Sequence, residues 1–328
     1  MNYEDSLREF EHLFNHEMSD EEMYSLLKNL RLDESTSAQT IAAAAHVMRK
    51  HSIPLHVNPT IKDKLIDIVG TGGDKIGSFN ISSTVSLLVA SAGIYVAKHG
   101  SRSVTSKSGS ADMFEKLGIR LDLSAQNSAK LLEETGFTFM FAQNYHPAMK
   151  FIMPIRKSIP DKTIFNILGP LTNPAGVKKT LLGVFDKSFV PKLANALHVN
   201  GSTDVLVVSS KEHMDEISIS DITYCAKLKN GIIEEFILDP INYGIKRAPL
   251  EAIIGGEGEE NAKILRDIFN NHATDAQRDI VLINSAAAFV VDGVARDFQD
   301  GLEIAKDAIH SGRAKEKLRQ IIEVSSKL

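Results

Sequence analysis

The chain has 328 residues, of which 43% are hydrophobic and 24% charged, proportions typical of a globular protein rather than a disordered or fibrous one. Its 42 acidic and 37 basic side chains give a net charge of −5, which argues against broad nucleic-acid binding but allows a local cationic pocket. The single cysteine, Cys225, excludes an internal disulfide and favours a reducing compartment. The N-terminus is polar and the apolar runs are too short to span a bilayer, so we expect a cytoplasmic location.

The first sixty residues have the pattern of helices. Ser19–Glu22 carries a capping-box pattern, and Ser37–Lys50 places apolar residues at helical spacing. Proline-rich chain between Pro147 and Pro174 is expected to cross back to this helical part. The sequence therefore predicts a small helical domain over residues 1–62, joined by part of 150–185, and a large domain over 63–328.

The large domain begins with a change of pattern. Leu65–Val69 predicts a buried strand, Ser82–Ala92 a helix and Tyr95–Ala97 a second strand. Further along, Val205–Val208 predicts another strand and Ile280–Val291 a long apolar helix. This alternation predicts an α/β domain with a mostly parallel sheet flanked by helices.

A glycine loop, Gly70-Thr71-Gly72-Gly73-Asp74, directly follows the first strand. Three glycines in four residues allow positive φ angles and close approach to a ligand, and consecutive N–H groups in such a turn form an anion site. The polar segment Ser78–Thr84 then begins the next helix, where N–H groups also point outward. The arrangement predicts a phosphate site, although it matches neither the Walker motif nor G-x-G-x-x-G. The alternative is a capped tight turn without a ligand.

A basic, serine-rich segment follows the second strand, from Lys98 to Asp112. Four basic residues and five serines surround two glycines. A serine hydrolase would instead need a serine beside a base supported by a third group. Hydroxyls and cations together predict a cradle for phosphate oxygens, with a solvated polar loop as the alternative.

Two adjacent acids, Asp215 and Glu216, lie just past the strand Val205–Val208. Loops at the carboxyl ends of parallel strands are where α/β proteins bind ligands. Carboxylates are hard oxygen ligands suited to Mg²⁺ held against phosphates. The pair is therefore a candidate metal site, although neighbouring acids can also be solvated surface.

Beyond these local signals, several blocks of the sequence resemble the anthranilate phosphoribosyltransferases of tryptophan biosynthesis. The glycine loop alone is shared with pyrimidine nucleoside phosphorylases, whereas the later blocks are far more specific. The blocks are Gly70–Asp74, Phe79–Ser82, Lys98–Gly100, Ser106–Asp112, Tyr145–Lys150, Phe165–Pro174 and Met214–Glu216.

The resemblance implies a small helical and a large α/β domain in a homodimer. The acidic net charge and the short apolar runs lead us to expect no nucleic acid and no membrane as partner. The resemblance also implies transfer of a phosphoribosyl group from 5-phosphoribosyl-1-pyrophosphate to the amine of anthranilate, with release of pyrophosphate. Mg²⁺ is the implied cofactor, expected as two ions bound with the pyrophosphate. Developing charge on that leaving group calls for Mg²⁺, Lys98 and backbone N–H groups placed to stabilise it.

The family's site residues carry over by position. Lys98 and His99 are implied to act in catalysis. The metal ions would meet Ser82, Asp215 and Glu216. The acceptor would meet Gly70, Ser101, His146 and Arg156. The donor would meet Gly70, Gly73, Asp74, Ser78, Asn80, Ile81, Ser82, Ser83, Lys98, His99, Gly100, Ser101, Arg102, Ser103, Val104, Thr105, Ser106 and Ser110.

Some of these residues keep a second interpretation. His99 could orient the acceptor or support its loop, and His146 is more easily a pocket wall or a structural residue than a base. Arg156 could anchor the acceptor carboxylate or pair with a nearby acid. Asn166 and Asn173 are expected to fix loop geometry.

The sequence also departs from the family in a few places. The family usually has Asn where this chain has Ser101, and Thr where it has Ser83. Ser158–Lys162 replaces a stretch that normally carries Gly and Arg. A hydroxyl at position 101 cannot offer separate donor and acceptor groups at the reach of an amide. These departures leave a phosphoribosyltransferase for another aromatic acceptor as an alternative. Two further alternatives are a pyrimidine nucleoside phosphorylase-like enzyme and a nucleic-acid-binding relative without enzymatic activity.

Overall fold

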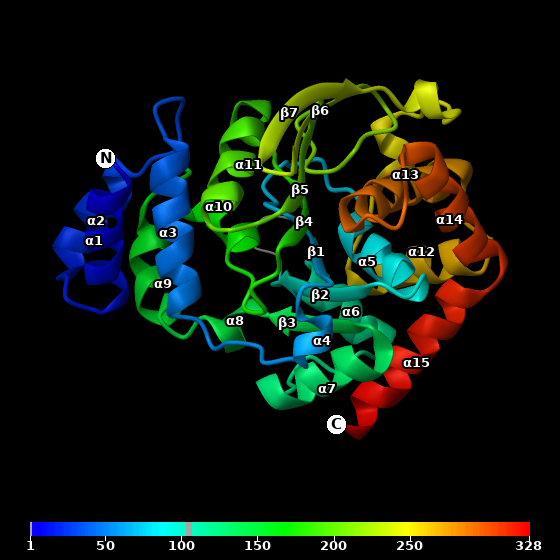
Figure 1. Cartoon of the computed structure of the whole chain (residues 1–328), viewed down its shortest axis with the longest axis horizontal. Coiled ribbons are helices and arrows are strands. Elements are labelled where there is room, and N and C mark those ends of the chain that lie inside the picture. Colours follow the sequence, from blue (N-terminus) through cyan, green and yellow to red (C-terminus); the bar gives the residue numbers. More distant parts are fainter. Residues whose placement is uncertain (1, 103–106) are drawn as a thin grey trace.

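The computed structural model describes residues 2–102 and 107–328, which build a seven-stranded mixed sheet flanked by helices (Figure 1). The strand order is β3-β2-β1-β4-β5-β6-β7. The pairs among β1 to β5 are parallel, whereas β6 and β7 add antiparallel. The strands are β1 (Leu65–Gly70), β2 (Tyr95–Gly100), β3 (Phe137–Phe141), β4 (Lys179–Gly183), β5 (Asp204–Ser210), β6 (Thr223–Lys229) and β7 (Ile232–Leu238). The predicted α/β class with a mostly parallel sheet is confirmed.

Helices cover both faces of the sheet, and the N-terminal helices lie at one end of the molecule (Figure 1). One group comprises α1 (Tyr3–Phe14), α2 (Asp20–Asn29), α3 (Ala38–Lys50), α9 (Met149–Ser158), α10 (Phe165–Leu168) and α11 (Val190–Val199). On the other side are α5 (Ile81–Ser91), α6 (Ser110–Leu117), α12 (Gly258–Phe269), α13 (Asp275–Asp292), α14 (Phe298–His310) and α15 (Arg313–Lys327). Shorter or peripheral helices are α4 (Pro59–Lys62), α7 (Ala125–Thr135) and α8 (Ala142–Tyr145), with 3₁₀ turns at Gly169–Leu171, Lys187–Phe189, Pro240–Tyr243 and Leu250–Ile253. Within the described chain, no helix has the length and apolar character needed to cross a bilayer.

Helix starts follow the local sequence closely. The predicted capping box is present, because the Ser19 side chain accepts from the Glu22 N–H and the Glu22 carboxylate accepts from the Ser19 N–H. Helix α13 begins five residues earlier than its apolar run predicts. The reason is a second capping box, in which Thr274 pairs with Gln277.

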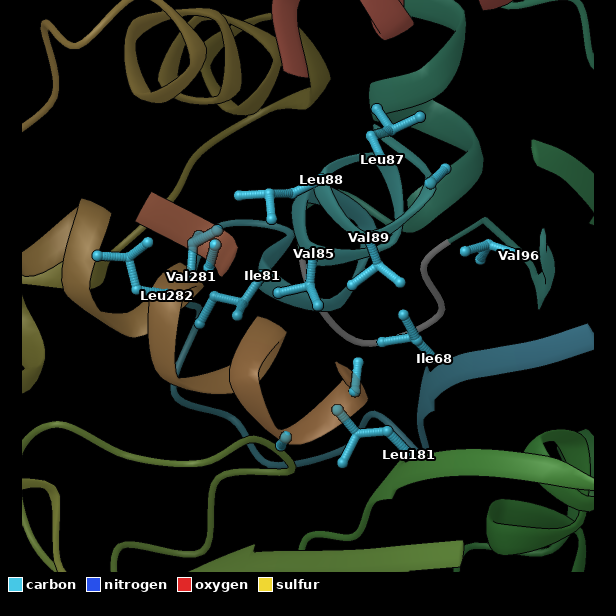
Figure 2. Close-up of a cluster of buried hydrophobic side chains, with 14 of the residues drawn as sticks. Ile68, Ile81, Val85, Leu87, Leu88, Val89, Val96, Leu181, Val281 and Leu282 are labelled. Atoms are coloured by element: carbon cyan, nitrogen blue, oxygen red, sulfur yellow. The ribbon is translucent and has the colours of Figure 1, made fainter. Parts of the chain in front are cut away.

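Alternate residues of each strand bury opposite faces of the sheet. Ile68 and Leu181 pack against α5 and α13, as Figure 2 shows with Val85, Val89 and Val281. The other face joins β4 and β5 to α11 and the N-terminal helices in a second core.

The chain returns to the N-terminal helices between α9 and α10. The Leu32 N–H donates to the Lys162 carbonyl at 2.9 Å, and the Ile164 N–H donates to the Leu30 carbonyl at 2.9 Å. The expected crossing of the Pro147–Pro174 segment is therefore present. The N-terminal helices lie beside α9 at one end of the molecule (Figure 1).

Candidate active site at the carboxyl ends of β1, β2 and β5

The glycine loop leaves the end of β1 in a conformation that few side chains tolerate. Gly72 and Gly73 have φ angles of +65° and +80°, and Lys75 and Gly77 follow with +64° and +75°. Positive φ at successive residues requires glycine at most of these positions. The loop begins against β4, where the Thr71 N–H donates to the Gly183 carbonyl at 3.0 Å.

The acidic pair lies directly on this loop. Asp215 Oδ2 accepts from the Gly72 N–H at 2.7 Å. A Cβ atom on Gly70 would lie 2.2 Å from the same oxygen, and one on Gly183 would lie 1.6 Å from the Asp215 carbonyl. Gly70 and Gly183 are therefore glycines because Asp215 passes over the ends of β1 and β4.

Glu216, the residue after Asp215, contacts the start of helix α5. Glu216 Oε1 accepts from the Ser82 N–H, in the first turn of α5, at 2.9 Å. A carboxylate at a helix N-terminus is favoured by the local backbone dipoles. The acidic pair thus joins the glycine loop to the polar helix start.

Lys98 completes this cluster from the end of β2. Its buried ammonium donates to the Ile68 carbonyl and, at 3.3 Å, to Ser82 Oγ. Burial lowers the pKa of Lys98, while the charges of Asp67, Glu216 and Asp215 raise it. The three segments singled out in the sequence therefore meet at one place.

The carboxylates of the cluster are electrostatically crowded. Burial, followed by the charge of Asp74, raises the pKa of Asp215 to about 7. Burial and the charge of Asp215 raise the pKa of Glu216 well above its usual value. A cation beside the pair would relieve both effects.

Ser82 supplies a hydroxyl to the same place, so the predicted metal-binding residues lie together. Across residues 2–102 and 107–328, no group of three or more His, Cys, Asp and Glu side chains could hold a metal ion alone. The donor set therefore fits Mg²⁺ that takes its remaining oxygens from a phosphorylated ligand and water, as Mg²⁺ commonly does.

The start of α5 is held to the basic segment by hydrogen bonds. Asn80 Nδ2 donates to the Ser108 carbonyl at 3.2 Å, and Asn80 Oδ1 accepts from Asn261 Nδ2 at 2.8 Å. Ser83 Oγ donates to Ser110 Oγ at 2.9 Å. The Ile81 side chain is buried in the core, so this residue can offer a ligand only its backbone.

The remaining predicted donor residues border this framework. Ser78 forms an isolated bridge with Ile254, and the Asp74 carboxylate accepts from the Ile76 N–H at 3.1 Å. A Cβ on Gly100 would lie 2.8 Å from the Phe139 ring, which accounts for glycine there. The predicted donor residues Ser103, Val104, Thr105 and Ser106 lie outside the described residues.

Ser101 and Arg102 are exposed at the start of that segment. Ser101 Oγ donates to the Arg102 carbonyl at 2.9 Å. The Arg102 guanidinium pairs with Asp112 and Glu115 of α6, each at 2.7 Å. Arg102 is therefore engaged with α6 and makes no recorded contact with the acidic cluster.

Two histidines form a buried pair beside β2. Their Nε2 atoms lie 3.2 Å apart, and His99 Nδ1 lies 3.2 Å from the Gly169 carbonyl. A ring nitrogen facing a carbonyl donates to it, so in neutral His99 the Nε2 atom accepts a hydrogen bond from the Nε2–H group of His146. Burial lowers the pKa of His99 to about 3 and that of His146 to about 4. Both rings are therefore neutral at physiological pH.

Arg156 lies in α9 without a carboxylate partner among the described residues. Its guanidinium faces Met153 Sδ at 3.7 Å, and burial lowers its pKa. The described structure therefore contains no intramolecular ion pair of Arg156, which was the alternative interpretation. An unpaired, half-buried guanidinium is suited to bind an external carboxylate.

Asn166 and Asn173 act on the chain as expected. Asn166 Oδ1 accepts from the Thr163 N–H at 2.9 Å. Asn173 Nδ2 donates to Asp67 Oδ2 at 2.7 Å and to the Ala97 carbonyl at 2.8 Å, which ties its loop to β1 and β2.

Sequence reasoning missed several residues that build this site. Gly183 ends a strand as Gly70 does, which was a usable signal. Asn284, an amide within an apolar helix, accepts from the Ile217 N–H at 2.9 Å and so supports the acidic loop. Lys162 donates to the Gly73 carbonyl at 3.1 Å. Nothing in the local sequence predicts that last contact across 89 residues.

Comparisons with known proteins agree with this geometry. Residues 62–315 match the glycosyl transferase family, a/b domain. Anthranilate phosphoribosyltransferase from Xanthobacter autotrophicus is 42% identical over 97% of this chain and 91% of its own length. The crystal structure of anthranilate phosphoribosyltransferase from Thermus thermophilus has a TM-score of 0.92 at 35% identity, covering 99% of this chain and 96% of that one.

The enzyme from Saccharomyces cerevisiae is also similar. Its complex with PRPP and Mg has a TM-score of 0.86 at 28% identity, covering 99% of this chain and 93% of that one. Its complex with 4-fluoroanthranilate has a TM-score of 0.86 at 25% identity, covering 99% and 92% of the two chains. The chain therefore belongs to the anthranilate phosphoribosyltransferase family.

Proposed function

We propose that the protein transfers the 5-phosphoribosyl group of 5-phosphoribosyl-1-pyrophosphate to the amine of anthranilate and releases pyrophosphate. The observation that carries this proposal is the direct contact of the glycine loop with Asp215, together with Lys98 and Ser82 at the same place. The related enzyme from Saccharomyces cerevisiae has solved structures in complex with PRPP and Mg and with 4-fluoroanthranilate.

The donor diphosphate would lie over the glycine loop and the first turn of α5. Among the described residues, the Gly73 and Asp74 N–H groups of the loop have no hydrogen-bond partner and are available to a ligand, whereas those of Thr71 and Gly72 already donate to Gly183 and Asp215. Asn80, Ser83 and Ser110 hold the surrounding backbone in place. These groups bind the leaving pyrophosphate more strongly as its negative charge grows.

Ser82, Asp215 and Glu216 would hold Mg²⁺ beside the diphosphate, and two ions are expected. When bound, the metal neutralises negative charge on the leaving group. The raised pKa values of Asp215 and Glu216, which burial and then neighbouring negative charge cause, support this role, because a bound cation would stabilise the ionised carboxylates. Lys98 supplies positive charge next to the Ser82 hydroxyl.

The acceptor site is assigned to Arg156, the histidine pair, Ser101 and the Gly70 backbone. Arg156 would bind the anthranilate carboxylate. His99 and His146 are neutral, so they present a polar, uncharged wall rather than a strong base. The aromatic amine is already a neutral nucleophile and needs only to be positioned against C1 of the ribose.

The test is a fluorescence assay of the whole protein. Anthranilate fluorescence is followed after mixing with 5-phosphoribosyl-1-pyrophosphate and Mg²⁺. We expect a loss of fluorescence that requires both the donor and the metal. Loss with another aromatic amine but none with anthranilate would assign a different acceptor, and no donor-dependent reaction with any amine would refute the transferase.

A homodimer is the expected assembly, on the grounds of the family resemblance. Light scattering on the purified protein measures its mass directly. A mass of about twice the 36.0 kDa of one chain is expected, and a monomer would contradict it.

A further inference from the structure

Lys162 connects two parts of the molecule. One is the helical layer, meaning the N-terminal helices with the α9–α10 segment that packs on them, and the other is the glycine loop. The Lys162 backbone belongs to the helical layer, because its carbonyl accepts from the Leu32 N–H and its neighbour Thr163 bridges to Arg31. Its side chain leaves that layer, and Nζ donates to the Gly73 carbonyl at 3.1 Å. This side chain therefore adds a direct contact between the part of the molecule that carries Arg156 and the donor loop.

The ammonium is held from two directions. Nζ lies 3.3 Å from the centroid of the Phe185 ring, in cation–π contact, while it donates to Gly73. Phe185 is buried and follows β4, so the ring is a fixed support. A surface lysine without such contacts would sample many rotamers.

Anchoring this carbonyl also fixes an N–H group. In a trans peptide the carbonyl of Gly73 and the N–H of Asp74 point in opposite directions. Gly73 has φ of +80°, and a glycine peptide rotates easily without an anchor. Among the described residues, neither the Gly73 nor the Asp74 N–H has a hydrogen-bond partner, so both are free to face a ligand.

The local charges place Lys162 beside the anion site. Burial and the neighbouring cation Lys75 lower the pKa of Lys162, whereas Asp186 and Asp74 raise it. Lys162 therefore lies within electrostatic range of the loop that would receive a diphosphate.

We propose that Lys162 is a positioning residue for the donor: by holding the Gly73 carbonyl, it turns the following N–H toward the diphosphate. The proposal rests on the proposed function for the identity of the donor. It goes beyond it by assigning the shape of the loop to a contact made from the helical layer.

The experiment compares Lys162→Met, which keeps the aliphatic stem, with Lys162→Arg, which keeps a charged donor. Lys157→Met, an exposed lysine at the end of α9, is the matched control. Calorimetry with pyrophosphate and Mg²⁺ measures binding without any transfer. We expect Lys162→Met to weaken binding about 10-fold, the size of one charge-assisted hydrogen bond, while Lys162→Arg and Lys157→Met stay within about twofold of wild type.

Steady-state rates add a readout that general destabilisation would not give. The KM for 5-phosphoribosyl-1-pyrophosphate should rise in Lys162→Met, with the KM for anthranilate unchanged. Equal pyrophosphate affinity in Lys162→Met and wild type, or equal rises in both KM values, would overturn the proposal. Should that variant lose thermal stability, Lys162→Gln replaces the ammonium with a shorter neutral amide, and undiminished pyrophosphate binding there would overturn the proposal as well.

The result of the Lys162 experiment can be distinguished from the result of the experiment that tests the proposed function. Wild-type protein that binds pyrophosphate with Mg²⁺ but transfers nothing to anthranilate would refute the assigned acceptor. The comparison of the Lys162 variants would still stand on pyrophosphate binding alone.

Discussion

At the scale of single residues, the unpaired guanidinium of Arg156 leads to the most specific prediction about the acceptor site. Arg156→Ala should raise the anthranilate KM about 10- to 100-fold, because a charge-assisted hydrogen bond to a carboxylate contributes about 1.5–3 kcal/mol. The donor KM should stay within about twofold of wild type, since Arg156 makes no recorded contact with the glycine loop. Initial rates with each substrate varied in turn measure both constants. Lys157→Ala, one residue further along α9, is the control, and equal rises in both constants would refute the assignment.

The buried histidines should give the protein an acid-sensitive stability. The pKa of His146 is about 4 in the folded protein and about 6.5 when unfolded, so only the unfolded chain takes up a proton between those values. Stability is therefore fully present above about pH 6.5 and falls as pH decreases toward 4.

Unfolding in urea at pH 7.5 and pH 5.5 measures this effect. The wild-type free energy of unfolding should drop by about 1 kcal/mol more than that of His146→Gln, which has no ionisable ring. His272→Gln, at an exposed position, should behave as wild type. The same drop in wild type and His146→Gln would show that His146 does not titrate on unfolding.

Without the family resemblance, residues of the site could be predicted mainly where they follow a strand. Lys98, Asp215 and Gly70 all come at or just past strand ends, and parallel strands bring such ends to one edge. The contact of His99 with His146 joins residues 47 positions apart and depends on how two loops pack, which no local pattern encodes. The kinds of side chain in the site could be predicted from the local sequence, but the contacts between residues far apart in the sequence could not.

At the scale of elements, the ends of β1 and β4 must stay open for the acidic loop. Gly183→Ala should lower the free energy of unfolding by at least about 2 kcal/mol, because its Cβ would lie 1.6 Å from the Asp215 carbonyl and backbone would have to move. Gly169→Ala is the matched substitution, since no atom lies within 4 Å of its added Cβ. Urea unfolding of the two variants measures the difference. A Gly183→Ala protein as stable as Gly169→Ala would mean that Asp215 does not cross the strand ends.

Periodicity predicted the parallel part of the sheet better than its edge. Val205–Val208 is a continuous apolar run, and Leu65–Val69 is apolar except for the buried Asp67, as expected of strands buried on both faces. Strands β6 and β7 have mixed, partly exposed patterns, and β7 lies at the edge of the sheet. Their antiparallel addition depends on tertiary contacts, so the alternation of strands and helices could not reveal it.

At the scale of the whole molecule, the sheet lies between two large cores, with a smaller third cluster that contains Leu65, Ala97 and Met140, and the candidate site lies at the carboxyl ends of its strands. The core around α5 and α13 supports the donor loop, and the core around α3 and α11 connects the sheet to the helices next to Arg156. The division into domains at residues 1–62 and 63–328 stays a prediction, because the second core runs continuously from the N-terminal helices to β4 and β5. A core that joins elements far apart in the sequence cannot be predicted by taking the segments one at a time in chain order.

The central claim is that the glycine loop, Lys98 and the acidic pair form one Mg²⁺-dependent site for the donor diphosphate. Calorimetric titration of 5-phosphoribosyl-1-pyrophosphate into wild type and Asp215→Asn/Glu216→Gln, with and without Mg²⁺, tests it most directly. The control is Glu234→Gln/Glu235→Gln, an adjacent pair of acids exposed on β7. We predict tight binding that needs Mg²⁺ in wild type and in the control, and loss of that metal-dependent binding in the Asp215/Glu216 variant. Equal, metal-dependent affinity in all three proteins would contradict the account.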